Sequence, residues 1–202
     1  MTRIDRRRFA ALAASFGAAL AAGPVAAAPA RWRERRDLYP QGVASGDPGP
    51  DSVILWTRRP PGPEGPARRL TVEVSDDAGF SRNTARGEAQ VGPETDWTCR
   101  FLAAGLKPGR EHFFRFTDEH GFGSRIGRTL TAPADDDPRP VRFTFVSCQD
   151  VTQGACNAYR RMIWEDERRP ADERIGFVLH LGDFIYEVVW YPEGDRTHRD
   201  GR

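Results

Sequence analysis

The chain has 202 residues, a length that suggests one or two domains. Hydrophobic residues make up 39% of it and charged residues 29%, which is ordinary for a globular protein and excludes an intrinsically disordered one. A formal net charge of +1 provides no basic surface, so no nucleic-acid binding is expected, and three cysteines are too few for a disulfide scaffold.

Residues 1–30 have the three parts of a signal peptide. Arginines come first, an alanine-rich apolar stretch fills positions 10–22, and small residues then provide a cleavage site after Ala28 or Ala30. At about 13 residues, the apolar stretch is too short to cross a bilayer as a helix. The sequence therefore predicts an exported chain with no transmembrane span.

The arginines of this segment indicate the export route. Arg6 and Arg7, followed by Phe9, resemble the twin-arginine signal, and the alanine-rich stretch is only weakly hydrophobic. An arginine-rich signal for the general secretory route is the alternative. We expect export of the folded protein by the twin-arginine machinery, and a periplasmic or secreted location.

Residues 38–133 have the pattern of a β-sandwich. Short runs that are β-branched and aromatic, or that alternate between apolar and polar residues, are separated by turns rich in glycine and proline. The predicted strands are 52–58, 70–75, 112–117 and 124–130. Short strands at this spacing favour an all-β sandwich of the fibronectin-III or immunoglobulin type, with Trp56 as a core residue.

Residues 106–112 resemble the corner that opens the sixth strand of fibronectin-type sandwiches. A tyrosine normally stands at the position of His112, and its hydroxyl bonds to the backbone upstream. His112 could replace that bond only through a ring nitrogen, so we expect a structural histidine and not a metal ligand. His120 lies beside a glycine in a predicted turn and is expected to be exposed.

A second domain is predicted at residues 141–202, after an acidic, proline-containing linker at 134–140. It begins with a strand at 141–147, continues with a helix at 155–167 and returns as a nearly continuous apolar strand at 175–181. Strand, helix and strand form a βαβ unit with parallel strands. The apolar side of the helix is expected to contain Ala158, Met162 and Ile163.

Three potential metal ligands follow these two strands. Cys148 comes directly after the first strand and Asp183 after the second, so parallel neighbours would place them side by side at the carboxyl edge of the sheet. Gly182 permits a turn, and Tyr186 would share a face with Asp183 if that turn is helical. A thiolate, a carboxylate and a phenolate together suit a hard, highly charged ion such as ferric iron.

Each of these residues also has a structural interpretation. Cys148 could be a small core residue, Asp183 could cap the following turn, and Tyr186 could be an interface aromatic. His180 could be structural or could support the site from behind the ligands. Whether Cys99 pairs with Cys156 is left open by the sequence.

Residues 182–186 match the Gly-Asp-x-x-Tyr signature of purple-acid-type, calcineurin-like metallophosphoesterases. Together with the Ser-Cys-Gln run at 147–149 and the segments 39–48 and 52–58, they give the chain a resemblance to the alkaline phosphatase D (PhoD-like) family over residues 39–190. The combination is far more specific than the five-residue signature alone. The fold class expected is an N-terminal all-β fibronectin-III/immunoglobulin-like sandwich followed by the incomplete start of an α/β metallophosphoesterase domain.

The resemblance implies a two-metal site and an exported phosphoesterase. Cys148, Asp183 and Tyr186 would bind Fe3+, and Asp183 would also bridge to a second ion, Ca2+. Phosphate monoesters or diesters would be hydrolysed by metal-activated water. The alternatives are a phosphodiesterase or phospholipase-D-like enzyme of the same family, and a non-catalytic β-sandwich binding module.

Further ligands are needed for such a site, and the family supplies them as asparagine and histidine from later motifs. His198 has no strand before it and is expected to lie in a loop. About 60 residues are also few for a layered α/β domain. We therefore expect an N-terminal fragment with a poorly buried last third and little or no catalysis of its own.

Overall fold

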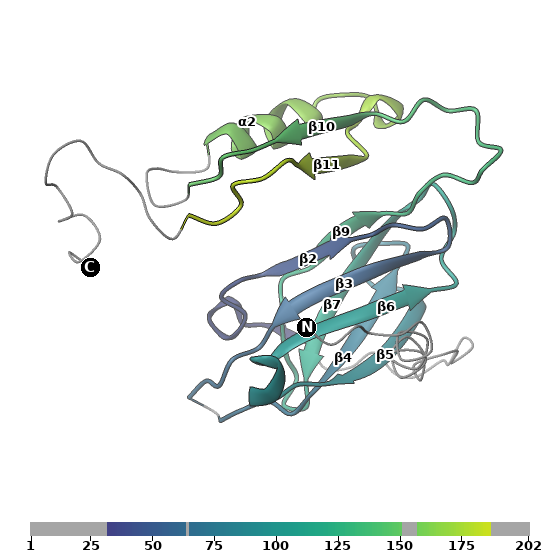
Figure 1. Ribbon diagram of the computed structural model, residues 1–202. Helices are drawn as coiled ribbons and strands as arrows, with labels where there is room; N and C mark the ends of the chain where they lie inside the picture. Colours follow the sequence, from purple (N-terminus) through teal and green to yellow (C-terminus); the bar gives the residue numbers. More distant parts are fainter. Residues whose placement is uncertain (1–31, 64, 151–156, 187–202) are drawn as a thin grey trace, which may run out of the picture. The chain divides into compact units, whose positions relative to one another are not determined.

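A computed structural model of the chain is shown in Figure 1. It describes residues 32–63, 65–150 and 157–186. The chain divides into two compact units, Met1–Asp137 and Pro138–Arg202. The boundary between the units falls within the segment 134–140, for which the sequence predicts a linker.

Some predictions concern residues outside the described part of the chain. These are the signal peptide at 1–30, Cys156 and His198. None of the helices in the described part has the length and hydrophobicity needed to span a bilayer.

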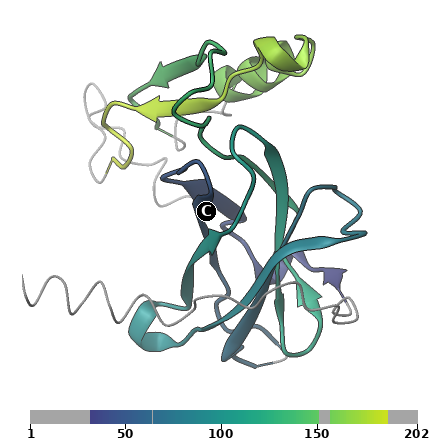
Figure 2. The same ribbon diagram turned by 90° about the vertical axis from the view of Figure 1, so that its right-hand side faces the viewer.

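The first unit is built from two β-sheets, whose strands can be followed in Figures 1 and 2. The three-stranded sheet has the order β2 (Val43–Gly46), β3 (Ser52–Arg58), β6 (Thr98–Ala104), and its pairs are antiparallel. The six-stranded sheet has the order β1 (Arg33–Glu34), β8 (Phe122–Gly123), β7 (Glu111–Asp118), β4 (Arg69–Ser75), β5 (Asn83–Gln90), with β9 (Gly127–Leu130) paired to β7. Two short 3-10 turns, η1 (Arg36–Leu38) and η2 (Pro93–Thr95), connect strands.

This architecture confirms the predicted sandwich. Four of its strands lie where the sequence predicts them, although β9 begins only at Gly127 and not at residue 124. Ser124 instead donates its hydroxyl to the Arg125 carbonyl and accepts the Phe116 N–H. The strands β1, β2, β5, β6 and β8 are additional to the predicted set.

Alternation along β3 decides which of its side chains enter the core. Val53 and Leu55 are at most 1% exposed and pack in one cluster with side chains from β4, β6 and β7. The prediction of Trp56 as a core residue is wrong, because a strand has a period of two and Trp56 lies between two inward-facing positions. Its side chain is half-buried on the opposite face, where Trp56 pairs in register with Ala44 and Arg100.

The sandwich also buries charge. Glu73 on β4 bonds Arg115 on β7 at 2.8 Å, and the guanidinium of Arg115 lies 4.2 Å from the centroid of the Phe80 ring. Arg59 and Asp118, both fully buried, are paired at 3.0 Å. Pairing is what makes these buried charges tolerable. Because Glu73 and Ser75 are buried as well as the apolar residue between them, both faces of this part of β4 are covered.

His112 has the structural role expected of it. Its side chain is fully buried, and Nε2 lies 3.4 Å from the Lys107 carbonyl oxygen five residues upstream. A ring nitrogen thus takes the place of the tyrosine hydroxyl of the fibronectin-type corner. On its other side, Nδ1 is 3.0 Å from the Asp76 carboxylate. His120 is exposed, as predicted.

The second unit begins with two strands and a helix. Strands β10 (Phe143–Val146) and β11 (Phe177–His180) are parallel, with Phe143 opposite Phe177 and Val146 opposite His180. Helix α2 (Asn157–Asp166) and the 3-10 turn η3 (Ala171–Glu173) lie between them along the chain. The parallel strand pair of the predicted βαβ unit is therefore present.

Burial in this unit differs from the sequence expectation for apolar elements. Phe177, Val178 and Leu179 on β11 are 39–43% exposed, although the apolar run predicts a buried strand. Of the three α2 residues predicted to form an apolar side, Ala158 and Ile163 are exposed and Met162 is half-buried, so that side is not a buried one. A parallel strand is buried only when both of its faces are covered, and the described residues do not provide both covers.

Candidate metal site at the ends of β10 and β11

The two strand ends continue their pairing beyond the last strand residues. The Leu181 N–H donates to the Val146 carbonyl at 2.8 Å, and the Cys148 N–H donates to the Gly182 carbonyl at 3.1 Å. One residue further, the Gln149 N–H donates to the Asp183 carbonyl at 2.9 Å. These backbone bonds hold the segment after β10 against the segment after β11, at the carboxyl edge of the parallel pair.

Backbone conformation at this edge is unusual. Cys148 has φ = 56° and Asp183 has φ = 53°, both in the left-handed region, and Gly182 has φ = 130°. Aspartate tolerates this region fairly well, whereas cysteine adopts it rarely. The sequence indicates a turn at Gly182 but contains no signal for the left-handed residue at Cys148. Left-handed residues interrupt the alternation of a strand, and such strain concentrates at functional sites.

The three predicted ligands are brought together. Asp183 Oδ2 accepts the Cys148 thiol at 3.3 Å and the Tyr186 hydroxyl at 2.9 Å. Cys148 and Asp183 are exposed and Tyr186 is half-buried, so all three can be reached from solvent. One carboxylate oxygen is thus shared by a sulfur and a phenolic oxygen from two chain segments 35 residues apart.

The electrostatics of the cluster follow from its acidic groups. The side-chain hydrogen bond with Cys148, and next the loss of solvent and the contact with Asp183, raise the pKa of Tyr186 above its usual value. A phenol beside a carboxylate keeps its proton because ionisation would place two negative charges together. A bound cation reverses this preference, since it favours the ionised form of every ligand.

The donor set fits a highly charged cation. Two protons now lie between one sulfur and two oxygens, and a single ion at that point would replace both. Asp183 Oδ1 makes no hydrogen bond with the described residues, which leaves it available to a second ion. In the same part of the chain, no group of three or more histidine, cysteine, aspartate or glutamate side chains is placed to hold a metal, so the set depends on Tyr186.

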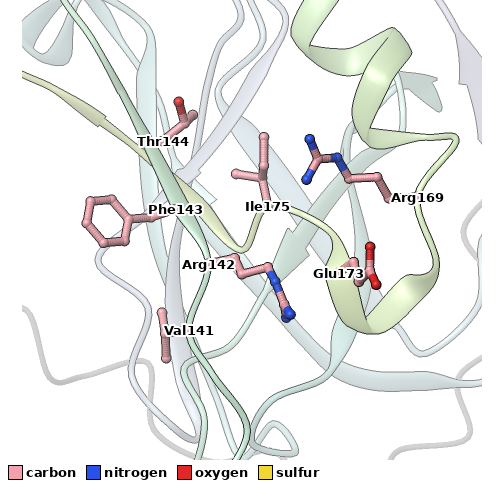
Figure 3. A pocket seen from close by; sticks show the side chains of 7 residues that line it. All are labelled: Val141, Arg142, Phe143, Thr144, Arg169, Glu173 and Ile175. Carbon is pink, nitrogen blue, oxygen red and sulfur yellow. The ribbon is translucent and has the colours of Figure 1, made fainter.

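A surface hollow in this unit lies at the other end of the strands (Figure 3). It is lined by Val141, Arg142, Phe143, Thr144, Arg169, Glu173 and Ile175. Figure 3 shows Arg169 and Glu173 on one side of it and the start of β10 on the other. Thr144 is the lining residue of β10 that is nearest to Cys148 in sequence, and it lies four positions before the cysteine in a segment that rises about 3.3 Å per strand residue. None of the three candidate ligands lines it.

The other cysteine with a described position belongs to the first unit. Cys99 on β6 is a free thiol in the sandwich core, only 1% exposed. Burial raises the pKa of Cys99 to about 12, so the thiol stays protonated and unreactive. Of the two cysteines with described positions, only Cys148 is exposed.

Comparison with known proteins matches both parts of the chain. Residues 25–133 match the model of the PhoD-like phosphatase N-terminal domain. The chain is 37% identical over 153 residues to alkaline phosphatase D of Bacillus subtilis (strain 168), in a match that covers 72% of this chain and 25% of that protein. A solved structure of PhoD matches with a TM-score of 0.63 and 35% identity, over 73% of this chain and 28% of that one.

The chain therefore spans about a quarter of the length of these relatives. The family match covers more than half of the chain, and the two similar proteins cover its larger part. The sandwich that leads into a parallel strand pair agrees with these matches. The chain belongs to the PhoD-like phosphatase family, and it carries that family's N-terminal domain.

Proposed function

We propose that this chain is the N-terminal region of an exported, metal-dependent phosphoesterase, in which Cys148, Asp183 and Tyr186 hold ferric iron. The observation that carries the proposal is the meeting of the Cys148 and Tyr186 side chains on one oxygen of Asp183. Family membership supports hydrolysis of a phosphate ester as the reaction. Export is proposed from the signal-like residues 1–30 alone.

The chemistry of the ligands favours ferric iron as the first ion. Thiolate, carboxylate and phenolate together carry three negative charges, which a trivalent cation balances. When bound, the metal would supply a Lewis acid that lowers the pKa of water and neutralises charge on a phosphate group. Calcium is proposed as a second ion beside Asp183, whose other oxygen is unbonded within the described residues.

The chain's own contribution is preorganisation. The backbone bonds from Cys148 and Gln149 hold the two ligand-bearing segments in register before any ion arrives. Left-handed backbone at Cys148 and Asp183 is already adopted, so binding requires little rearrangement. Asp183 orients the Tyr186 hydroxyl and the Cys148 thiol through one oxygen.

Metal binding tests the proposal. The 202-residue chain, reconstituted with ferric iron, is expected to retain iron and to show a tyrosinate-to-iron charge-transfer band. Tyr186→Phe should abolish the band, and Cys148→Ser and Asp183→Asn should weaken iron binding by at least about tenfold. Tyr159→Phe, a half-buried tyrosine on α2, is the matched control and should change neither. Absence of bound iron, or a band that persists in Tyr186→Phe, contradicts the proposal and favours a non-catalytic module.

Turnover separates the remaining alternatives. Chromogenic phosphate monoesters and diesters, assayed with iron and calcium, should report little or no hydrolysis by the 202 residues, because three ligands leave much of a two-ion site unfilled. Robust turnover by the 202-residue chain contradicts this expectation. In a longer relative, the ratio of monoester to diester hydrolysis distinguishes a phosphatase from a phosphodiesterase.

A further inference from the structure

His180 contacts the residues on both sides of the candidate ligand Asp183. It is the last residue of β11 and lies opposite Val146 in the parallel pair. Its Nδ1 accepts the Gly182 N–H at 3.4 Å. Its ring meets the Phe184 ring edge to face, with centroids 4.9 Å apart and planes at 75°. The imidazole therefore contacts the residue before Asp183 and the residue after it.

The bond to Gly182 fixes the form of the ring. An amide N–H always donates, so Nδ1 must be unprotonated, and the neutral ring carries its proton on Nε2. Nε2 is buried and has no hydrogen-bond partner among the described residues. Within the described residues, the imidazole therefore makes two contacts: Nδ1 with the Gly182 N–H, and the ring with Phe184.

The Gly182 N–H has no place in the strand pairing. At this step, the ladder uses the Leu181 N–H and the Gly182 carbonyl. Gly182 has φ = 130°, a conformation that other residues rarely adopt, and an unbonded amide there would leave the turn free to reorient. His180 supplies the missing acceptor from within the same turn.

We propose that His180 is a positioning residue: its Nδ1 holds the Gly182–Asp183 turn so that the Asp183 carboxylate stays between Cys148 and Tyr186. The link to metal binding rests on the proposed function, whereas the effect on the turn does not. Packing of the ring against Phe184 is the competing structural role, and substitutions can separate the two.

Three variants at this position keep different parts of histidine. His180→Asn places an amide oxygen close to the position of Nδ1, so the acceptor is retained without the ring. His180→Gln places its amide near the position of Nε2, and His180→Phe keeps an aromatic ring without an acceptor. His120→Phe, in an exposed turn of the sandwich, is the control for histidine loss elsewhere.

The first measurement uses the metal-free chain and follows the Gly182 amide by NMR hydrogen exchange. Exchange should accelerate about five- to tenfold in His180→Phe and His180→Gln, and return toward the wild-type rate in His180→Asn. The second measurement is iron affinity, which should fall about 10–100-fold in the same two variants and recover in His180→Asn. Near-wild-type exchange of the Leu181 amide, which bonds the Val146 carbonyl beside this turn, shows in each variant that the strand pair is still formed.

The outcomes separate the two proposals. Unchanged Gly182 exchange in His180→Phe overturns the positioning role, and so does faster exchange with unchanged iron affinity in a chain that binds iron. Failure of His180→Asn to rescue also overturns it and assigns His180 to packing. A wild-type chain that binds no iron overturns the proposed function, while the exchange pattern still decides whether His180 holds the turn.

Discussion

The two units use apolar strands in opposite ways. In the sandwich, Val53 and Leu55 on β3 are at most 1% exposed, because the facing sheet covers them. In the second unit, β11 is as apolar as β3, yet Phe177, Val178 and Leu179 remain 39–43% exposed. The sandwich completes its own core, whereas the second unit brings three candidate ligand side chains together without burying the strands that precede them. Among the described residues, the candidate ligands therefore meet at the ends of β10 and β11 even though these strands are not buried in a core.

A buried ion pair provides the strongest test of this difference. Arg59→Met leaves the Asp118 carboxylate buried without its partner and should lower the free energy of unfolding by about 3–5 kcal/mol. Arg161→Met removes the exposed Arg161–Glu165 pair on α2 and should cost no more than about 0.5 kcal/mol. Denaturant unfolding of both variants measures the contrast. Equal losses would contradict it.

A matched pair of leucines tests the core directly. Leu55→Ala removes a fully buried side chain and should destabilise the sandwich by about 2–5 kcal/mol. Leu179→Ala removes one that is 43% exposed and should change stability by no more than about 0.5 kcal/mol. Thermal unfolding followed by circular dichroism gives both values. A large loss in Leu179→Ala would show that β11 is covered in solution.

The polar contacts of His112 should contribute less to the stability of the sandwich than its apolar core does. His112→Phe keeps the ring volume but loses the contacts to the Lys107 carbonyl and to Asp76, at an expected cost of about 1–3 kcal/mol. His120→Phe, in the exposed turn, is the control and should be nearly neutral. Chemical denaturation measures the free energy of unfolding of both variants. No loss of stability in His112→Phe would show that the ring of His112 matters only for packing.

The smallest expected effect is pH-dependent. The hydrogen bond from Lys107, partly opposed by burial and assisted by His112, lowers the pKa of Asp76 below its usual value. A carboxyl whose folded-state pKa is depressed stabilises the fold above its unfolded pKa, near 4, and loses that contribution as pH falls through the folded pKa. Asp76→Asn should therefore cost up to about 1 kcal/mol at neutral pH, and the difference should vanish in acid.

Unfolding of Asp76→Asn and of wild type, measured from pH 7 down to pH 2, checks this sign. Lys107→Gln should show a similar but smaller dependence, because it removes the first of the groups that lower the pKa of Asp76. A difference that grows in acid contradicts the assignment.

Much of the fold was predictable because local sequence patterns indicate where strands and helices form. The run at 52–58 coincides with β3, and the change to a strand–helix–strand pattern after the linker reappears as β10, α2 and β11. The error at Trp56 shows the limit of such patterns. Large aromatic residues are usually buried, but the register of β3 gives its inner face to Val53, Leu55 and Thr57.

The placement of the candidate ligands was predictable for a topological reason. Parallel neighbouring strands end at the same edge, so Cys148 and Asp183 had to emerge close together once β10 paired with β11. The left-handed backbone at Cys148 and the contact of His180 with Gly182 were not predictable. Both depend on how two segments distant in sequence pair beyond their strands.

The sequence by itself indicated the main strands of the sandwich, the parallel pairing in the second unit and the three candidate ligands that follow it, because spacing along the chain is enough to specify these. Only the tertiary structure decided that Glu73 and Arg115 are buried together, that Trp56 faces outward and that β11 is half-exposed. Burial depends on what packs against each face of an element. A local sequence pattern shows which residues share a face, but not whether another element packs against that face.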